Sequence, residues 1–381
     1  MSRQYHPGLP AGLRRTDSAF LAVLLAVALL SGCSSLDYYA QAGRGHLQLM
    51  QQREPIEQVL ADPSRDVRLQ QRLALALQAR QFASSRLALP DNASYRSYAE
   101  IGRPAVLWNV FVTPEFSLAP QLQCFPIAGC VAYRGYYDQG RARGAAALAQ
   151  EAGMDSWVGA VEAYSTLGWF DDPILSSMLR RDDQQLAAVI FHELAHQQLY
   201  VGDDTAFNES FASFVEQEGL RQWLASRGEV PREPQLACRH RQFVALVMQT
   251  RERLDALYAR RMPTAARRQA KQAEFARLQA DYRQLRDGPW QGKGYYDSWM
   301  AGPMNNAKLL PFGLYDQWVP AFAVLFAQSG QQWPAFYSRV AVLAELPAAA
   351  RQARLQDLLA AGAGRVETDC SVEANRRGGE S

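Results

Sequence analysis

Two histidines separated by four positions lie inside a nearly uncharged stretch, and this combination constrains the fold more than any other feature of the chain. The segment 192–196 reads HELAH, and residues 189–191 before it are Val, Ile and Phe. Positions i and i+4 lie on the same face of an α-helix. The pattern predicts a helix from about 183 to 200 that is largely buried. Its two imidazoles and its carboxylate then need partners inside the protein.

A metal ion would satisfy these side chains directly. Zinc is bound tetrahedrally by imidazole nitrogens, and two of the chain's five histidines are His192 and His196. Bound zinc lowers the pKa of water towards about 7, so an adjacent carboxylate can take its proton during attack on a carbonyl carbon. We therefore expect Zn²⁺ at His192 and His196 and a general-base role for Glu193. The alternative is a pair of core histidines satisfied by hydrogen bonds.

Three glutamates downstream of the motif are candidates for the third ligand. If residues 201–203 form the turn of an antiparallel helix pair, the rise of about 1.5 Å per residue selects among them. The midpoint of the histidine pair lies roughly 9 Å from this turn, and Glu209 lies about 8 Å along the returning helix. Glu216 lies about 18 Å along it, and Glu218 lies further still. We expect Glu209 to be the third ligand and Glu216 to be solvated or to support a ligand from outside.

Aspartates and tyrosines are candidates for supporting roles. Asp203 and Asp204 stand where the returning helix begins, so we expect them to cap it, or one of them to orient a histidine ring. Peptide-bond chemistry also needs a donor for the developing oxyanion. We choose Tyr315 for this role, because it follows residues 305–307 on a predicted helix that runs past the site. The other candidates are Tyr164, Tyr295 and Tyr296.

The N-terminus has the pattern of an export signal with a lipidation site. Three arginines precede an apolar run over 19–30, and the sequence LSGC follows at 30–33. These features are typical of a bacterial lipoprotein signal peptide. We expect removal of residues 1–32, lipid on Cys33, and tethering on the periplasmic side of the cell envelope. Ser34, by resemblance to lipoprotein sorting signals in enteric bacteria, favours the outer membrane; the alternative is an uncleaved anchor helix.

The charge of the mature chain is balanced. Residues 1–32 contain three Arg and one Asp, so 37 of the 40 basic and 37 of the 38 acidic residues remain. A neutral chain gives no reason to expect nucleic acid as a partner. Residues 239–287 hold twelve Lys or Arg and five Asp or Glu. We expect a solvated helical face there, with contact to an anionic surface as the alternative.

Four cysteines remain once Cys33 carries lipid. An even number in an oxidising compartment suggests two disulfides, and four cysteines permit three pairings. The close spacing of Cys124 and Cys130 favours a local bridge, which would leave Cys238 to pair with Cys370. A zinc site built from cysteines is disfavoured, because the sequence contains no Cys-x-x-Cys pair.

The local composition and apolar pattern of the chain change several times along its length. Apolar residues at helical spacing between 47 and 87 predict two helices with a break at 62–64. Residues 239–287 lack glycine and predict a long helical hairpin. Strands are predicted where β-branched and aromatic residues gather, at 105–112, 131–137 and 157–165, and an alanine-rich helix is predicted at 140–152.

These changes divide the sequence into five regions. They are a signal peptide at 1–32, an N-terminal helical segment at 33–100, a catalytic core at 101–235, a helical hairpin at 236–290, and a C-terminal helical segment with its tail at 291–381.

The motif and its surroundings resemble a known family. HELAHQ at 192–197 followed by NESFA at 208–212 is similar to the gluzincin pattern, in which the glutamate of the second segment is the third zinc ligand. Together with CFPIAGCVAYRGY at 124–136, AYSTLGWF at 163–170 and the lipidation site, it resembles a family of bacterial lipoproteins described as predicted zinc aminopeptidases. The similarity extends over almost the whole mature chain.

The resemblance implies an α+β fold with a zincin-like core, made of a small mixed sheet, the motif helix and the glutamate helix, with further helical segments around it. It implies a peptide substrate and an aminopeptidase that uses zinc-bound water activated by Glu193. Two alternatives remain open: an endopeptidase of the same mechanism, and a non-catalytic envelope lipoprotein whose zinc site only joins two helices.

Overall fold

The computed structural model describes residues 37–125, 129–163, 165–232 and 235–362. The chain forms two compact units, Met1–Gln51 and Gln52–Ser381. The first unit contributes a helix over residues 37–51, and the sheets and the other helices belong to the second. The expected signal peptide and Cys33 lie outside the described residues, so both stay predictions.

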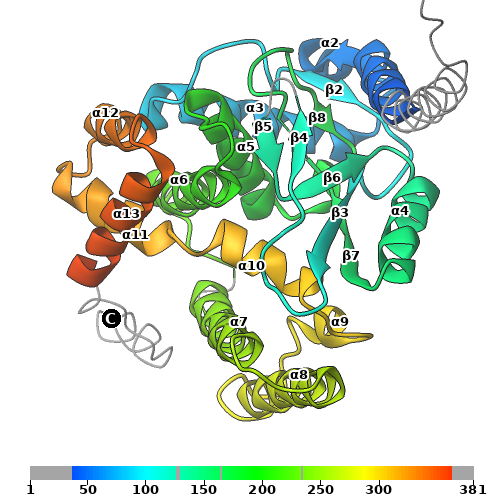
Figure 1. Ribbon diagram of the computed structural model, residues 1–381. Coiled ribbons are helices and arrows are strands. Elements are labelled where there is room, and N and C mark those ends of the chain that lie inside the picture. The colour runs from blue at the N-terminus through cyan, green and yellow to red at the C-terminus, as the bar shows by residue number, and fades with distance from the viewer. Residues whose placement is uncertain (1–36, 126–128, 164, 233–234, 363–381) are drawn as a thin grey trace, which may run out of the picture. The chain divides into compact units, whose positions relative to one another are not determined.

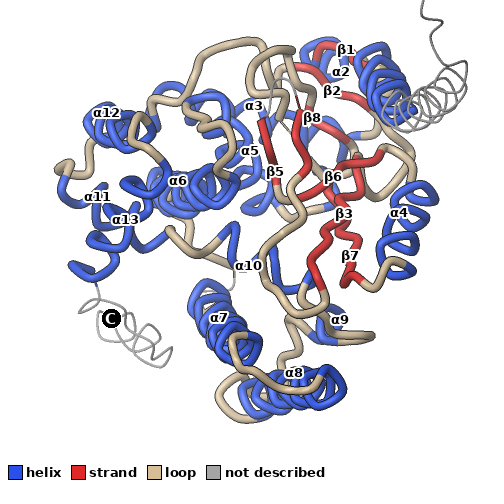
Figure 2. Tube along the Cα trace, viewed as in Figure 1, coloured by secondary structure: helices blue, strands red, loops and turns tan. Residues whose placement is uncertain are grey.

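The largest sheet of the second unit is antiparallel and has the order β6-β3-β7 (Figures 1 and 2). β3 (Leu107–Pro114) pairs with β6 (Tyr133–Tyr136) on one side and with β7 (Met154–Val161) on the other. β6 lies within its predicted run, and β3 and β7 overlap theirs with shifted ends. The β-branched and aromatic residues that suit a pleated, covered surface are concentrated there.

Both faces of this sheet are covered by helices. Ser156 on β7 donates to the carbonyl of Ala146 on α4 (Gln139–Glu151), the predicted alanine-rich helix. The next residue, Trp157, points to the opposite face, where it packs in the cluster that includes Leu310 and Leu314. The sheet therefore lies between α4 and the chain segment that carries Tyr315.

A second small sheet was not predicted. It has the order β1-β2-β8, with β1 (Arg53–Pro55) antiparallel to β2 (Ser97–Ala99) and β2 parallel to β8 (Ile174–Leu175). Strands of two or three residues are too short for an alternating pattern to be read. The region 33–100, expected to be helical, therefore also contains two strands.

The predicted break in the N-terminal helices is confirmed. α2 (Ile56–Ala61) ends before Asp62, and α3 (Val67–Leu87) begins after Asp66, whose side chain accepts from the backbone N–H of Leu69. Such a cap satisfies one of the free N–H groups of the first turn, so a new helix starts there.

The centre of the second unit is the antiparallel pair α5 (Asp183–Gln198) and α6 (Thr205–Ser226). A capping box between Asp182 and Gln185 fixes the start of α5. Large side chains on both helices are fully buried, and they contact α3 and the C-terminal helices; examples are Phe191, Phe207 and Phe211. The predicted buried helix is thus confirmed.

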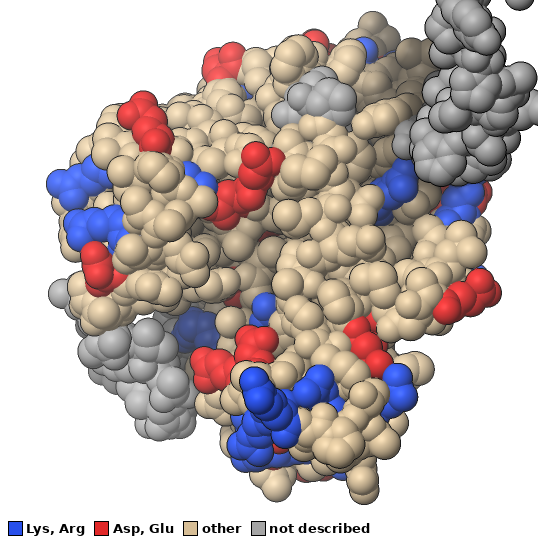
Figure 3. Space-filling model, viewed as in Figure 1, with Lys and Arg blue, Asp and Glu red and all other residues tan. Residues whose placement is uncertain are grey.

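The expected helical hairpin consists of α7 (Leu236–Tyr258) and α8 (Thr264–Asp287). Figure 3 shows Lys and Arg gathered on the surface over these two helices. Several of these cations pair with carboxylates on the hairpin or on the β3 to β7 region, namely Arg253 with Glu274, Arg268 with Glu115, and Lys271 with Asp155. The local positive charge is therefore partly balanced by neighbouring acids.

The remaining helical elements are short, and the two between residues 310 and 328 pack on α6. These remaining elements are η1 (Met178–Arg180), α9 (Asp297–Met300), η2 (Ala307–Leu309), α10 (Leu310–Tyr315), α11 (Val319–Gln328), α12 (Trp333–Ala344) and α13 (Ala348–Gly362). Within the described ranges, residues 307–328 are long and apolar enough to cross a membrane, and half of the most apolar part of this segment is buried inside the protein. A buried core segment meets the same criterion. The fold as a whole is of the mixed α+β class, as predicted.

Candidate metal centre

Helix α5 directs three ionisable side chains into the interior. His192 is 9 % exposed and Glu193 is 7 % exposed, and the rings of His192 and His196 lie 4.9 Å apart as neighbours on one helix face. Burying such groups is unfavourable unless each finds a partner. The two imidazoles therefore mark a site.

Helix α6 returns from the turn and brings Glu209 opposite the two rings. Its Oε2 atom lies 3.4 Å from Nε2 of His192 and 3.5 Å from Nε2 of His196. The three ligand atoms lie within 4.8 Å of one another, and the cluster gains no fourth His, Cys, Asp or Glu from the described part of the chain. The structure thus brings together the three residues predicted to bind a metal.

This cluster fits a tetrahedral metal ion. Metal–ligand distances of about 2.0–2.1 Å place tetrahedral ligand atoms about 3.3 Å apart, close to both separations from Glu209. Within the described residues, Oε2 of Glu209 is buried and has no hydrogen-bond partner. Two nitrogens and one carboxylate oxygen form a donor set suited to zinc.

The charges of the site keep Glu209 in the form that a metal requires. Burial alone would raise the pKa of Glu209, but His196 and His192 lower it to about 2. The carboxylate is therefore ionised at any pH near neutrality and can donate electrons to a cation.

Glu216 orients the first histidine. Its Oε2 lies 2.9 Å from Nδ1 of His192, which leaves Nε2 facing Glu209. Ligating histidines usually form such a bond through the second ring nitrogen, because it fixes the ring and its tautomer. The estimate of 18 Å along the axis rightly excluded Glu216 from the cluster. Distance along the helix axis does not report how two helices cross. The crossing of α5 and α6 brings the Glu216 side chain to the Nδ1 edge of the His192 ring.

The two aspartates of the turn have different roles. Asp204 caps α6 by accepting from the N–H of Phe207, as predicted, and also pairs with Arg351. Asp203 does not cap the helix. Its Oδ1 accepts from the backbone N–H of Cys130, 2.5 Å away on strand β5. The contacts that the structure gives these aspartates do not include a histidine ring.

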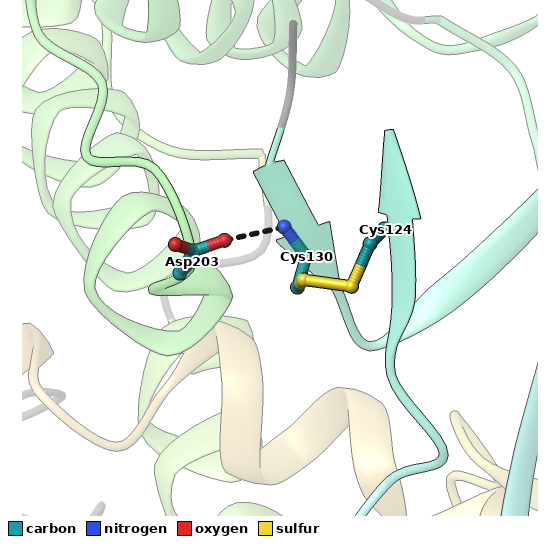
Figure 4. The surroundings of a disulfide bond; sticks show 3 residues. All are labelled: Cys124, Cys130 and Asp203. Carbon is teal, nitrogen blue, oxygen red and sulfur yellow. Dashed lines mark hydrogen bonds between the residues drawn. A yellow bond between two sulfur atoms is a disulfide. The ribbon is translucent and has the colours of Figure 1, made fainter. Parts of the chain in front are cut away.

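A disulfide strengthens the strand that Asp203 holds (Figure 4). Cys124 on β4 (Gln123–Phe125) is bonded to Cys130 on β5 (Gly129–Val131), and the two residues are paired in register. A Cβ atom at Gly129 would lie 2.6 Å from Oδ1 of Asp203, so only glycine allows this approach. The local disulfide is confirmed.

The expected second disulfide is only partly described. Cys238 on α7 is disulfide-bonded. Cys370 lies outside the described residues, so its pairing with Cys238 stays a prediction.

Glu193 is next to the candidate ligands but is not part of their cluster. Burial raises its pKa; the two histidines lower it, while Glu209 and Glu216 raise it further. A carboxylate with a raised pKa binds a proton more readily than an ordinary one does. This property suits a group that takes a proton from water and passes it on.

Two tyrosines face the candidate metal ligands. The ring of Tyr315, at the end of α10, stacks on the ring of His192 with centroids 6.1 Å apart. The hydroxyl of Tyr133 on β6 donates to Oε1 of Glu209 at 3.4 Å. Burial and then the charge of Glu209 raise the pKa of both phenols well above their ordinary value. Both therefore stay protonated and can donate hydrogen bonds.

Of the candidate tyrosines, Tyr315 lies against His192, and its catalytic role stays a prediction. Tyr133 was not among the candidates. The available signal was its place on a predicted strand, whose alternate side chains point the same way. Tyr164 lies outside the described residues. Tyr295 and Tyr296 bond to α7, through Arg239 and His240 respectively.

The residues on either side of Glu209 bond to neighbouring parts of the chain and hold α6 in place. The Asn208 side chain accepts from the N–H of Val201 and donates to the carbonyl of Val201, which closes the turn between α5 and α6. Ser210 donates to the carbonyl of Leu314 and accepts from the N–H of Trp318. Each residue of the triplet 208–210 therefore has a distinct structural task.

An α+β fold with a buried cluster of two histidines and a glutamate defines a protein with a candidate metal centre. Residues 37–355 match the family described as "Putative aminopeptidase", and the chain belongs to this family. Its description supports a peptidase. No curated protein and no solved structure matches the chain.

Proposed function

We propose that the protein is a zinc-dependent peptidase of the aminopeptidase type with a zincin-like core. The observation that carries the proposal is the buried Oε2 of Glu209, which faces both Nε2 atoms on a helix that also presents Glu193. A zinc ion held by His192, His196 and Glu209 would polarise a substrate carbonyl and acidify water.

The protein's own groups account for the other requirements of peptide hydrolysis. Glu193 takes a proton from the attacking water and delivers it to the leaving amine, because it is the buried carboxylate beside the ligands. Tyr315 stays protonated and donates a hydrogen bond to the negative charge that develops on the carbonyl oxygen. Tyr133 donates a hydrogen bond to Oε1 of Glu209 and so holds that carboxylate in place. Glu216 keeps His192 in place.

The three-residue cluster favours catalysis over a purely structural role. A structural zinc site is closed by a fourth protein ligand, whereas a catalytic site keeps one position open. A zinc site that only joins two helices would also not need the carboxylate of Glu193 beside it.

Replacement of Glu193 by Gln tests this proposal. Zinc content, measured by atomic absorption, should stay near one ion per chain, and peptide hydrolysis should fall by roughly 10²–10⁴-fold. Glu218→Gln is the matched control, since Glu218 lies on α6 and bonds to Arg221 away from the cluster; it should keep full activity. Bound zinc without hydrolysis of any peptide by the wild type would favour the structural alternative.

Which bond of the peptide substrate is cleaved is a separate question. An aminopeptidase requires a free amino terminus, so N-acetylated peptides should be resistant while the unblocked peptides are cleaved from the first residue. Equal cleavage of both sets, at internal bonds, would make the protein an endopeptidase of the same mechanism.

We also propose that the mature chain is a lipoprotein of the cell envelope, tethered through Cys33 on the periplasmic side and in the outer membrane. The support is the sequence LSGC at residues 30–33 with Ser34 after it. Labelled palmitate should be incorporated into the wild type but not into Cys33→Ser, and fractionation should place the wild type in outer-membrane vesicles.

A further inference from the structure

Helix α7 contacts the chain beside the metal centre through several side chains, and His240 is the one that binds the residue next to Tyr315. Its Nδ1 atom lies 2.7 Å from the hydroxyl of Tyr296, and its Nε2 atom lies 2.9 Å from Oδ1 of Asp316. Tyr296 is itself fixed, because its ring stacks on Phe243 of α7 with centroids 3.7 Å apart. Both ring nitrogens of His240 are therefore engaged, and the imidazole has one orientation.

Asp316 directly follows Tyr315, whose ring stacks on His192. The backbone on both sides is held by α6, since the Ser210 hydroxyl bonds to the carbonyl of Leu314 and to the N–H of Trp318. Two helices thus hold this corner of the chain: α6 binds its backbone, and α7 binds the side chain of Asp316.

The charges around His240 favour this bond. Burial lowers the pKa of His240, but Asp316 and the more distant Glu216 raise it, with Arg241 opposing them, and the net direction is upward. An imidazolium donates from both nitrogens, to the carboxylate of Asp316 and to the oxygen of Tyr296. A charge-assisted bond of this kind is stronger than a neutral one.

We propose that His240 is a positioning residue of the metal centre: through Asp316 it holds the Tyr315 ring against His192, where the Tyr315 hydroxyl serves the developing oxyanion. The proposal rests on the proposed peptidase function for its catalytic part. Under this proposal the α7–α8 hairpin supports the site through His240, although neither of its helices supplies a candidate metal ligand.

The position of Tyr315 can be observed without catalysis. We would place 3-fluorotyrosine at position 315 and record its ¹⁹F NMR signal in the zinc-loaded full chain. The wild type and the control Arg253→Gln, on the same helix but paired with Glu274, should give the same single line. His240→Gln and Asp316→Asn should each shift or broaden it. An unchanged line in both folded variants would overturn the proposal.

Activity supplies the second measurement, as a double-mutant cycle. His240→Gln should lower kcat by roughly tenfold with KM unchanged, the scale of losses from groups that support a site from outside. The same substitution in a Tyr315→Phe background should have almost no further effect, because the group it positions has been removed. Additive losses would mean that His240 acts on general stability instead.

The two measurements separate this proposal from the proposed function. A shifted fluorine signal in a protein that hydrolyses no peptide would leave the positioning role standing and reject the peptidase. The opposite result would be a wild type that hydrolyses peptides, variants whose fluorine signal is unmoved, and additive losses in the cycle. It would reject the positioning role and leave the proposed peptidase standing.

Discussion

The two antiparallel helix pairs of this protein differ in how deeply they bury their ionisable side chains. α5 and α6 bury imidazoles and carboxylates, with His192, Glu193 and Glu209 each less than 10 % exposed. α7 and α8 keep most of their charges near the surface, where Arg253 and Glu274 retain about a quarter of their side-chain exposure. The buried cations Arg239 and Lys271 are exceptions, and each is bonded to a side chain outside the hairpin, Tyr295 and Asp155 respectively. Buried ionisable groups are costly and persist where they are used, whereas exposed pairs contribute little. A cluster of imidazoles and carboxylates, and not the amount of charge, therefore locates the site.

The largest stability effect should come from the packing of the buried pair. Phe211 on α6 is fully buried against Phe322 and Phe336. Phe211→Ala should lower the free energy of unfolding by about 3–5 kcal/mol, because it removes an aromatic ring and leaves a cavity. Urea unfolding measures this loss. Val342→Ala, at a side chain 63 % exposed, is the control and should change stability by less than about 0.5 kcal/mol.

A pH-dependent effect should follow at Asp172, which packs against the end of α5 through Gln197. Burial raises its pKa to about 7, against the opposing hydrogen bonds from Thr166. The folded protein therefore holds this proton more tightly than the unfolded chain, whose aspartate has a pKa of about 4. The contribution of Asp172 to stability is full below about pH 4 and is lost as the pH rises through about 7.

Asp172→Asn should remove this dependence. At pH 8 the variant should be more stable than the wild type by up to about 4 kcal/mol, the value of some three pKa units. At pH 5 the difference should be much smaller. Urea unfolding at both pH values decides the matter, and an equal difference at the two would show that Asp172 does not titrate in this range.

A smaller effect is expected where Glu216 supports His192. Glu216→Ala should weaken zinc binding by about 10–100-fold, the usual consequence of removing a partner behind a ligand. Competition with a chromophoric chelator measures the affinity, with Glu218→Ala as control on the same helix. Unchanged affinity would mean that the ring is held by other contacts.

The smallest effect belongs to the partly exposed ion pair of the hairpin. Breaking the bond between Arg253 and Glu274 by Arg253→Gln should cost less than about 1 kcal/mol, and added salt should reduce that cost further. A loss of several kcal/mol would contradict the contrast between the two helix pairs.

The sequence predicts the part of the site that depends on local geometry. His192, His196 and Glu209 follow from helix periodicity and one turn, and the structure places them together. The contacts of Tyr133 with Glu209 and of His240 with Asp316 join residues 76 positions apart. Such contacts depend on how strands and helices pack, which no periodicity reports. The same reason explains the missed sheet, where β2 pairs with β8 across more than seventy residues.

The closeness of the three ligands along the chain has a consequence for folding. All of them lie between residues 192 and 209, and the amide of Asn208 closes the turn that joins their helices. Contacts between residues so near in sequence need little loop closure and form early. Because the free energy of metal binding is coupled to folding, an ion bound by these residues would stabilise this pair of helices before distant strands are paired. The site would then act as a nucleus for the fold that surrounds it.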